Sequence, residues 1–145
     1  MRQVNIKIPR QIFNHIEAII KQRANAGKLD KPIVFAMYTT VDDHSEIIDY
    51  KEIPTVQVTG NYTKGDYDYK YPGISKLGFY PKKSIGRWFS GTLVFGDGTQ
   101  LNESDKKWML RDEMYFRIKA AMDNNGKLLW KAYYLDYPEV SLDLL

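Results

Sequence analysis

The most informative segment of this chain is Gly91-Thr-Leu-Val-Phe-Gly-Asp-Gly-Thr-Gln-Leu-Asn-Glu-Ser-Asp105-Lys-Lys-Trp108. It begins as an apolar strand, turns at Gly96-Asp-Gly98 and continues into a helix that Asn102 caps. Asp105 stands three positions after Asn102 and completes an approximate capping box, so we expect a helix near residues 102–112. Sites are common at such a step from strand to helix, but this segment contains no histidine or cysteine. It therefore indicates architecture rather than a reaction.

The chain before this segment predicts a strand, a long helix and a strand pair. Residues 4–8 alternate apolar with polar side chains, and the apolar residues that follow recur at helical spacing up to Gly27, which suits the end of a helix. The run from Ile33 to Tyr38 is short and uniformly apolar, as in a buried strand. Residues 46–53 are expected to form its returning partner.

The chain after this segment predicts a second strand pair. Residues 114–120 alternate as in a strand with one buried face, which places Arg117 and Lys119 on the opposite face. A hairpin loop at 123–126 joins this strand to its partner at 127–135. The apolar C-terminal end either docks on its own domain or contacts a neighbouring chain.

Length and composition place these elements in one domain that spans residues 1–145. The chain is 43% hydrophobic and 27% charged, which is ordinary for a globular protein. A domain of this size buries roughly 70% of the surface that its unfolded chain exposes. We therefore expect an α/β fold in a single compact domain, with a mixed β-sheet, an N-terminal amphipathic helix and a second helix near 102–112.

The composition also excludes several classes of site. Cysteine is absent and histidine occurs only twice, which removes disulfides, thiolate nucleophiles and zinc–thiolate sites. We expect a cytoplasmic protein with no cofactor and no metal. Because no apolar run approaches the ~20 residues of a membrane span, we expect no membrane partner. The net charge of +3 selects no partner by itself.

Residues 59–84 form a tyrosine- and glycine-rich insertion in which lysines alternate with aromatic side chains. Such a mixture suits a protein interface or the stacking of nucleic-acid bases, and it equally suits a loop that covers its own sheet. Acidic residues interrupt the basic ones, which favours a protein partner over nucleic acid. The candidate binding residues are Tyr69, Tyr71, Lys82, Lys83, Arg87 and Trp88.

The order of elements is similar to that of the JAB/MPN (Mov34) domain, a family of zinc isopeptidases and their non-catalytic relatives. Three matches carry the resemblance: the strand and helix at 4–24, the buried strand and its return at 33–54, and the Asn102-Glu-Ser-Asp105 segment. The family's site motif is His-x-His-Pro, a short spacer and Ser-x-x-Asp.

Laying Asp105 on the last position of that motif places Asn102 on its serine, and Thr92 and Val94 on its two histidines. Asp30 stands near the place of the family's general-base glutamate. The vestigial site positions that the resemblance implies are thus Asp30, Asn102 and Asp105. Because the metal-binding pair is missing, the resemblance implies a member that has lost catalysis.

Three functions remain open at this point. The first is a non-catalytic interaction module that binds a protein, the second a metal-assisted hydrolase with a rearranged carboxylate site, and the third a single-stranded nucleic-acid binder that uses the insertion. No recognised motif pairs a serine with either histidine. His44 beside Asp42 and Asp43 indicates a solvated turn rather than a metal site. The sequence assigns no catalytic residue, partner identity or oligomeric state.

Overall fold

The computed structural model describes residues 4–28, 32–53, 55–59, 62–65, 83–84, 87–96, 98–111 and 113–145. Two helices lie in these ranges, α1 (Arg10–Asn25) and α4 (Glu103–Arg111). The strands are β1 (Asn5–Ile8), β2 (Ile33–Thr39), β3 (Ile47–Ile53), β4 (Thr55–Thr59), β5 (Tyr62–Gly65), β6 (Lys83–Ser84), β7 (Arg87–Phe95), β8 (Phe116–Met122), β9 (Leu128–Tyr134) and β10 (Glu139–Leu144).

The main sheet has the strand order β1-β10-β9-β8-β7-β2-β3, and the short β6 pairs beside β7. Strands β1 and β10 are parallel, as are β7 and β8, whereas the other neighbours along this order are antiparallel. Strands β4 and β5 form a separate two-stranded ribbon. The fold is thus the predicted single α/β domain with a mixed sheet.

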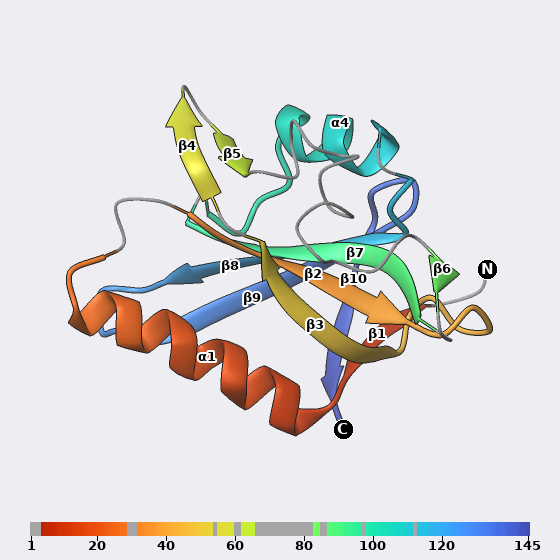
Figure 1. Ribbon diagram of the computed structural model, residues 1–145, viewed down its shortest axis with the longest axis horizontal. Coiled ribbons are helices and arrows are strands. Elements are labelled where there is room, and N and C mark those ends of the chain that lie inside the picture. The colour runs from red at the N-terminus through yellow and green to blue at the C-terminus, as the bar shows by residue number, and fades with distance from the viewer. Residues whose placement is uncertain are drawn as a thin grey trace.

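The two edges of this sheet approach each other. Lys7 of β1 makes an isolated parallel bridge to Glu46, and its backbone N–H donates to the carbonyl oxygen of Ser45 at 2.8 Å. The sheet is therefore curled, with α1 along its concave side and α4 on the opposite side (Figure 1). Ile16 and Ile20 of α1 are fully buried on the concave side, as the helical spacing of the apolar residues predicts.

Each face of the sheet has its own hydrophobic core. Phe35 and Phe116 belong to the core under α1, and Val34 and Trp108 to the core under α4. All seven residues of β2 are buried because helices cover both faces of the sheet, which confirms the expected buried strand. The C-terminal end docks on its own domain, since β10 pairs with both β9 and β1.

The prediction that β8 has only one buried face is wrong. Arg117 is 4% exposed and Lys119 is fully buried. Parallel neighbours such as β7 and β8 need a crossover connection, and α4 lies in that connection over the face that carries both cations. Alternation along a strand separates its two faces but does not tell whether the polar face meets water or another element.

Several predicted features lie outside the described residues. These are Asp30, Asp97 and most of the insertion at 59–84, including Tyr69, Tyr71 and Lys82. Neither of the described helices is long and apolar enough to cross a membrane.

Candidate functional site

The first turn of α4 carries the capping box that the sequence predicts. The backbone N–H of Asp105 donates to the side-chain oxygen of Asn102 at 2.8 Å, and the N–H of Asn102 donates to Oδ2 of Asp105 at 2.9 Å. These reciprocal bonds satisfy two donors that a helix otherwise leaves without partners at its start. Asp105 is only 1% exposed, so its carboxylate lies between the helix and the sheet rather than in solvent.

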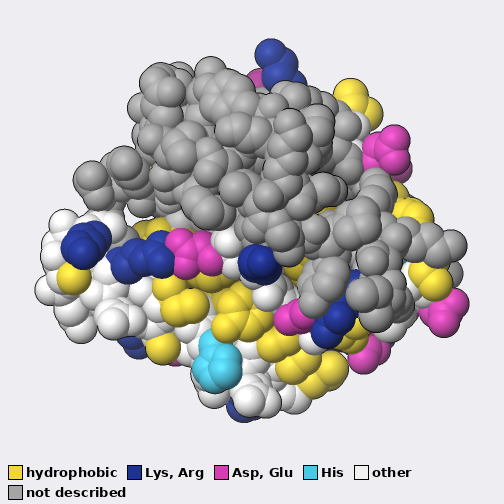
Figure 2. Space-filling model, viewed as in Figure 1, with side chains coloured by type: hydrophobic (Ala, Val, Ile, Leu, Met, Phe, Trp, Pro, Cys, Tyr) yellow, Lys and Arg dark blue, Asp and Glu magenta, His cyan; other side chains and the backbone are white. Residues whose placement is uncertain are grey.

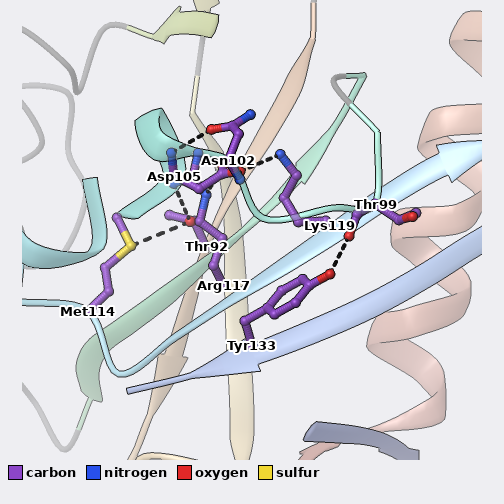
Figure 3. Close-up of polar contacts among 8 residues, drawn as sticks. All are labelled: Thr92, Thr99, Asn102, Asp105, Met114, Arg117, Lys119 and Tyr133. Carbon is purple, nitrogen blue, oxygen red and sulfur yellow. Dashed lines mark hydrogen bonds and ion pairs between the residues drawn. The ribbon is translucent and has the colours of Figure 1, made fainter. Parts of the chain in front are cut away.

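Two cations from β8 bind this buried carboxylate (Figure 3). Nε of Arg117 donates to Oδ1 of Asp105 at 2.8 Å, and Nζ of Lys119 donates to Oδ2 at 2.8 Å. Nη1 of Arg117 also donates to the hydroxyl of Thr92 on β7 at 3.1 Å. We call Thr92, Asp105, Arg117 and Lys119 the Asp105 cluster. It joins α4 to the two parallel strands at the centre of the sheet.

The register of the sheet explains why these residues meet. Thr92 pairs with Arg117 and Val94 pairs with Lys119 across the parallel β7–β8 ladder. Residues two apart on a strand share a face, so both cations and Thr92 point to the side on which α4 lies. The sequence offered one signal for this cluster: an acidic residue in the first turn of a helix directly before a strand with two cations on one face.

The residues of the Asp105 cluster do not fit a zinc ion. Structural and catalytic zinc sites use three or four donors from cysteine, histidine and carboxylate side chains. Here each oxygen of Asp105 already accepts a hydrogen bond from a cationic side chain, and the positive charges of Arg117 and Lys119 would repel a divalent ion at the same place. Among the described residues, no group of three or more histidine, cysteine, aspartate or glutamate side chains stands close enough to hold a metal.

Tyr133 anchors the loop that leads into α4. Its hydroxyl donates to the carbonyl oxygen of Thr99 at 2.7 Å (Figure 3). Burial and the nearby Glu139 raise the pKa of this phenol above its usual value. The neutral, donating form is therefore favoured, and the loop is held at the same end of the sheet as the Asp105 cluster.

A second cluster of polar side chains includes His44. Nδ1 of His44 lies 3.1 Å from Oγ of Ser90, and that oxygen lies 2.7 Å from Oγ1 of Thr39. The imidazole stacks on Tyr115, with 4.0 Å between ring centroids and 5° between ring planes. A turn at residues 42–45 is present, but His44 is packed against the domain rather than simply solvated. Sequence motifs gave no sign of the His44–Ser90 pair because its members are 46 residues apart.

The His44–Ser90 pair does not have the accessibility of a nucleophile and its base. Ser90 is fully buried, and its hydroxyl is already in contact with Thr39 and with the carbonyl oxygen of Trp88 at 3.3 Å. A catalytic serine must reach a substrate carbon as well as its base. We read the pair as a structural contact that fixes the imidazole beside a hollow of about 610 Å³, which Lys7 and Asp43 also line.

Three of the candidate binding residues meet at one end of β7, where Lys83 pairs with Trp88 across the β6–β7 ladder. Arg87 and Trp88 begin β7, and Nε of Arg87 lies 2.9 Å from Oδ2 of Asp49. Lys83 belongs to β6, which pairs with this end of β7. On the face drawn in Figure 2, the described Lys and Arg side chains are interspersed with Asp and Glu side chains rather than arranged as an uninterrupted basic stripe.

The chain was compared with protein-family models and with curated proteins. No protein-family model matches the chain, and no curated protein matches it.

Proposed function

We propose that this chain is a non-catalytic protein-binding module, built like a JAB/MPN domain in which a buried ion cluster replaces the metal. The observation that carries the proposal is the Asp105 cluster. The resemblance aligns Thr92 and Val94 with the two metal-binding histidines of the family motif, and these residues pair in register with Arg117 and Lys119. The two cations bind the aspartate that the same motif would assign to the metal.

The cluster supports a structural role for this position. A zinc hydrolase needs a metal that lowers the pKa of bound water to ~7, and it needs an open coordination position for that water. At Asp105, buried donors occupy the carboxylate and the side chain is closed off from solvent. The hydroxyl of Ser90 is closed off in the same way. Because neither the carboxylate of Asp105 nor the hydroxyl of Ser90 is open to a substrate, these residues support recognition rather than catalysis as the role of the domain, and we place the protein in the cytoplasm.

Metal analysis tests the non-catalytic half of this proposal. The purified, untagged chain is incubated with zinc, freed of excess and measured by plasma mass spectrometry. We expect far less than stoichiometric zinc, equally in the wild type and in Asp105→Asn. A near-stoichiometric ion that Asp105→Asn removes would contradict the proposal and favour the metal-assisted hydrolase.

Reconstitution tests the binding half. A protein captured from cell extract is identified, purified and titrated against the chain by calorimetry, and we expect a saturable complex of defined stoichiometry. A labelled single-stranded oligonucleotide is the comparison ligand. Tight oligonucleotide binding whose salt dependence weakens in Lys82→Ala/Lys83→Ala would instead favour the nucleic-acid reading.

A further inference from the structure

An apolar hollow lies between the C-terminal end of α4 and the turn that joins β9 to β10. It has a volume of about 350 Å³, and Met109, Leu110, Leu135 and Tyr137 contribute to its walls. We call it the α4 hollow. It is distinct from the Asp105 cluster, which lies at the other end of the same helix.

Large apolar side chains are unusually exposed here. Leu110 is 75% exposed, Leu135 46% and Tyr137 38%, whereas Met109 and Met114 beneath them are buried. Exposed apolar residues that gather at one place mark interaction sites more often than residues scattered singly. Methionine adapts its shape to different neighbours, so a floor of two methionines suits a surface that accepts a foreign side chain.

The backbone around the α4 hollow is strained. Of the described residues other than glycine, those with positive φ are Glu113 (54°), Asp136 (68°) and Tyr137 (72°), and all three line the hollow. Each such residue costs of the order of 1–2 kcal/mol relative to the right-handed conformation. Residues held in such conformations cluster at functional sites, including those that hold ligands.

The charge around the hollow indicates what it binds. The chain as a whole carries a net charge of +3, yet among the residues whose side chains the structure describes, the charged ones that line the hollow are the carboxylates Glu113 and Asp136. The ammonium group of Lys106 lies over the ring of Tyr137, 5.4 Å from its centroid, and Lys106 does not itself line the hollow. An acidic rim around an apolar floor complements an apolar side chain that has a basic neighbour.

We propose that the α4 hollow docks a segment of a partner protein that presents an aliphatic or aromatic side chain next to lysine or arginine. This inference rests on the proposed protein-binding function and assigns it a surface. The apolar side chain packs between Leu110, Leu135 and Tyr137, and the basic side chain faces Asp136.

Peptide display tests this assignment. A phage-displayed library of random dodecapeptides is selected on the full chain, and the enriched peptides are synthesised with a fluorophore and titrated by anisotropy. We expect enriched sequences in which lysine or arginine neighbours an apolar residue. Leu110→Lys should weaken their binding by about tenfold or more, because it removes an apolar contact and adds a like charge. Lysine is as good a helix former as leucine, so this change should leave α4 folded.

Two further variants make the result specific. Leu129→Lys makes the same substitution at an exposed leucine of β9 outside the hollow, and it should change the affinity by less than about twofold. Asp136→Asn keeps a residue that tolerates positive φ but removes the charge, so it should weaken binding several-fold at low salt and less at high salt. Far-UV circular dichroism establishes that each variant is folded.

Four outcomes would overturn the assignment. If the peptides bind Leu110→Lys as tightly as wild type, or if acidic sequences are enriched, the hollow is not the docking surface, although protein binding itself stands. If the wild type self-associates in sedimentation velocity and Leu110→Lys is monomeric, the occupant is a second copy of the chain. If no sequence is enriched, the hollow does not dock a peptide segment, and the reconstitution described above then decides whether the chain binds a protein at all.

Discussion

Replacement of Asp105 by alanine should destabilise the domain far more than the loss of a helix cap. Asp105 is 1% exposed and its carboxylate accepts hydrogen bonds from Arg117, from Lys119 and from the backbone of Asn102. Removing one partner of a buried ion pair costs about 3–5 kcal/mol, because the remaining charge stays buried. The cap alone contributes about 1 kcal/mol. A domain is stable by only about 5–15 kcal/mol, so Asp105→Ala should lose a large part of the total.

Urea unfolding followed by tryptophan fluorescence measures this loss, with Asn102→Ala as the matched control that removes only the cap. We expect Asn102→Ala to lose about 1 kcal/mol and Asp105→Ala about 3–5 kcal/mol, with similar dependence on urea concentration. A triple variant that also changes Arg117 and Lys119 to methionine should regain stability relative to Asp105→Ala, since no buried charge of the cluster is then left behind. A loss of about 1 kcal/mol or less in Asp105→Ala would refute the argument, because it would leave capping as the only contribution.

Three other positions give independent tests. Gly91→Ala should cost about 1–3 kcal/mol in urea unfolding, because the added methyl would meet the backbone carbonyl and ring of Phe116 on the neighbouring strand; unchanged stability would contradict this packing. Hydrogen bonds from Ser45 lower the pKa of Asp43 in the folded protein. This carboxylate therefore contributes stability above its unfolded pKa of about 4, and that stability is lost as the pH falls through the lower pKa of the folded state. Acid titration of Asp43→Ala should therefore show a shallower loss of stability below pH ~4, and an unchanged acid limb would count against it. Glu113→Gly should be more stable than Glu113→Ala by about 1 kcal/mol, since only glycine adopts the left-handed end of α4 without strain; equal midpoints would show that the strain is absent.

Most elements of this fold could be predicted because local patterns determine them, but the strands β5, β6 and β10 were not predicted. The buried strand at Ile33, the helix end at Gly27 and the capping box of Asn102 and Asp105 depend on residues within a few positions of each other. Their hydrogen bonds and apolar spacing are properties of one segment, so they can be recognised without knowledge of the rest. The helix expected near 102–112 is observed at Glu103–Arg111.

The candidate site could be predicted only in part. The sequence indicated that Asp105 begins a helix, but it predicted a single buried face for the strand and put Arg117 and Lys119 on the other face. It also did not pair His44 with Ser90. These contacts join residues that are 12, 14 and 46 positions apart in the chain. Which residues meet over such separations depends on strand order and register, and a sequence pattern does not contain either.

By itself the sequence determined most of the elements and their order, although not the strands β5, β6 and β10. It also determined which chemistry is missing, since no cysteine is present and only two histidines are. Tertiary structure alone decided what the polar residues do. The parallel pairing of β7 with β8 sends the chain over the sheet through α4, and that crossover buries the face on which Arg117 and Lys119 lie. Burial makes a charge costly unless an opposite charge lies against it, so the same side chains that would be solvated on an open sheet become the ion cluster that holds α4 in place.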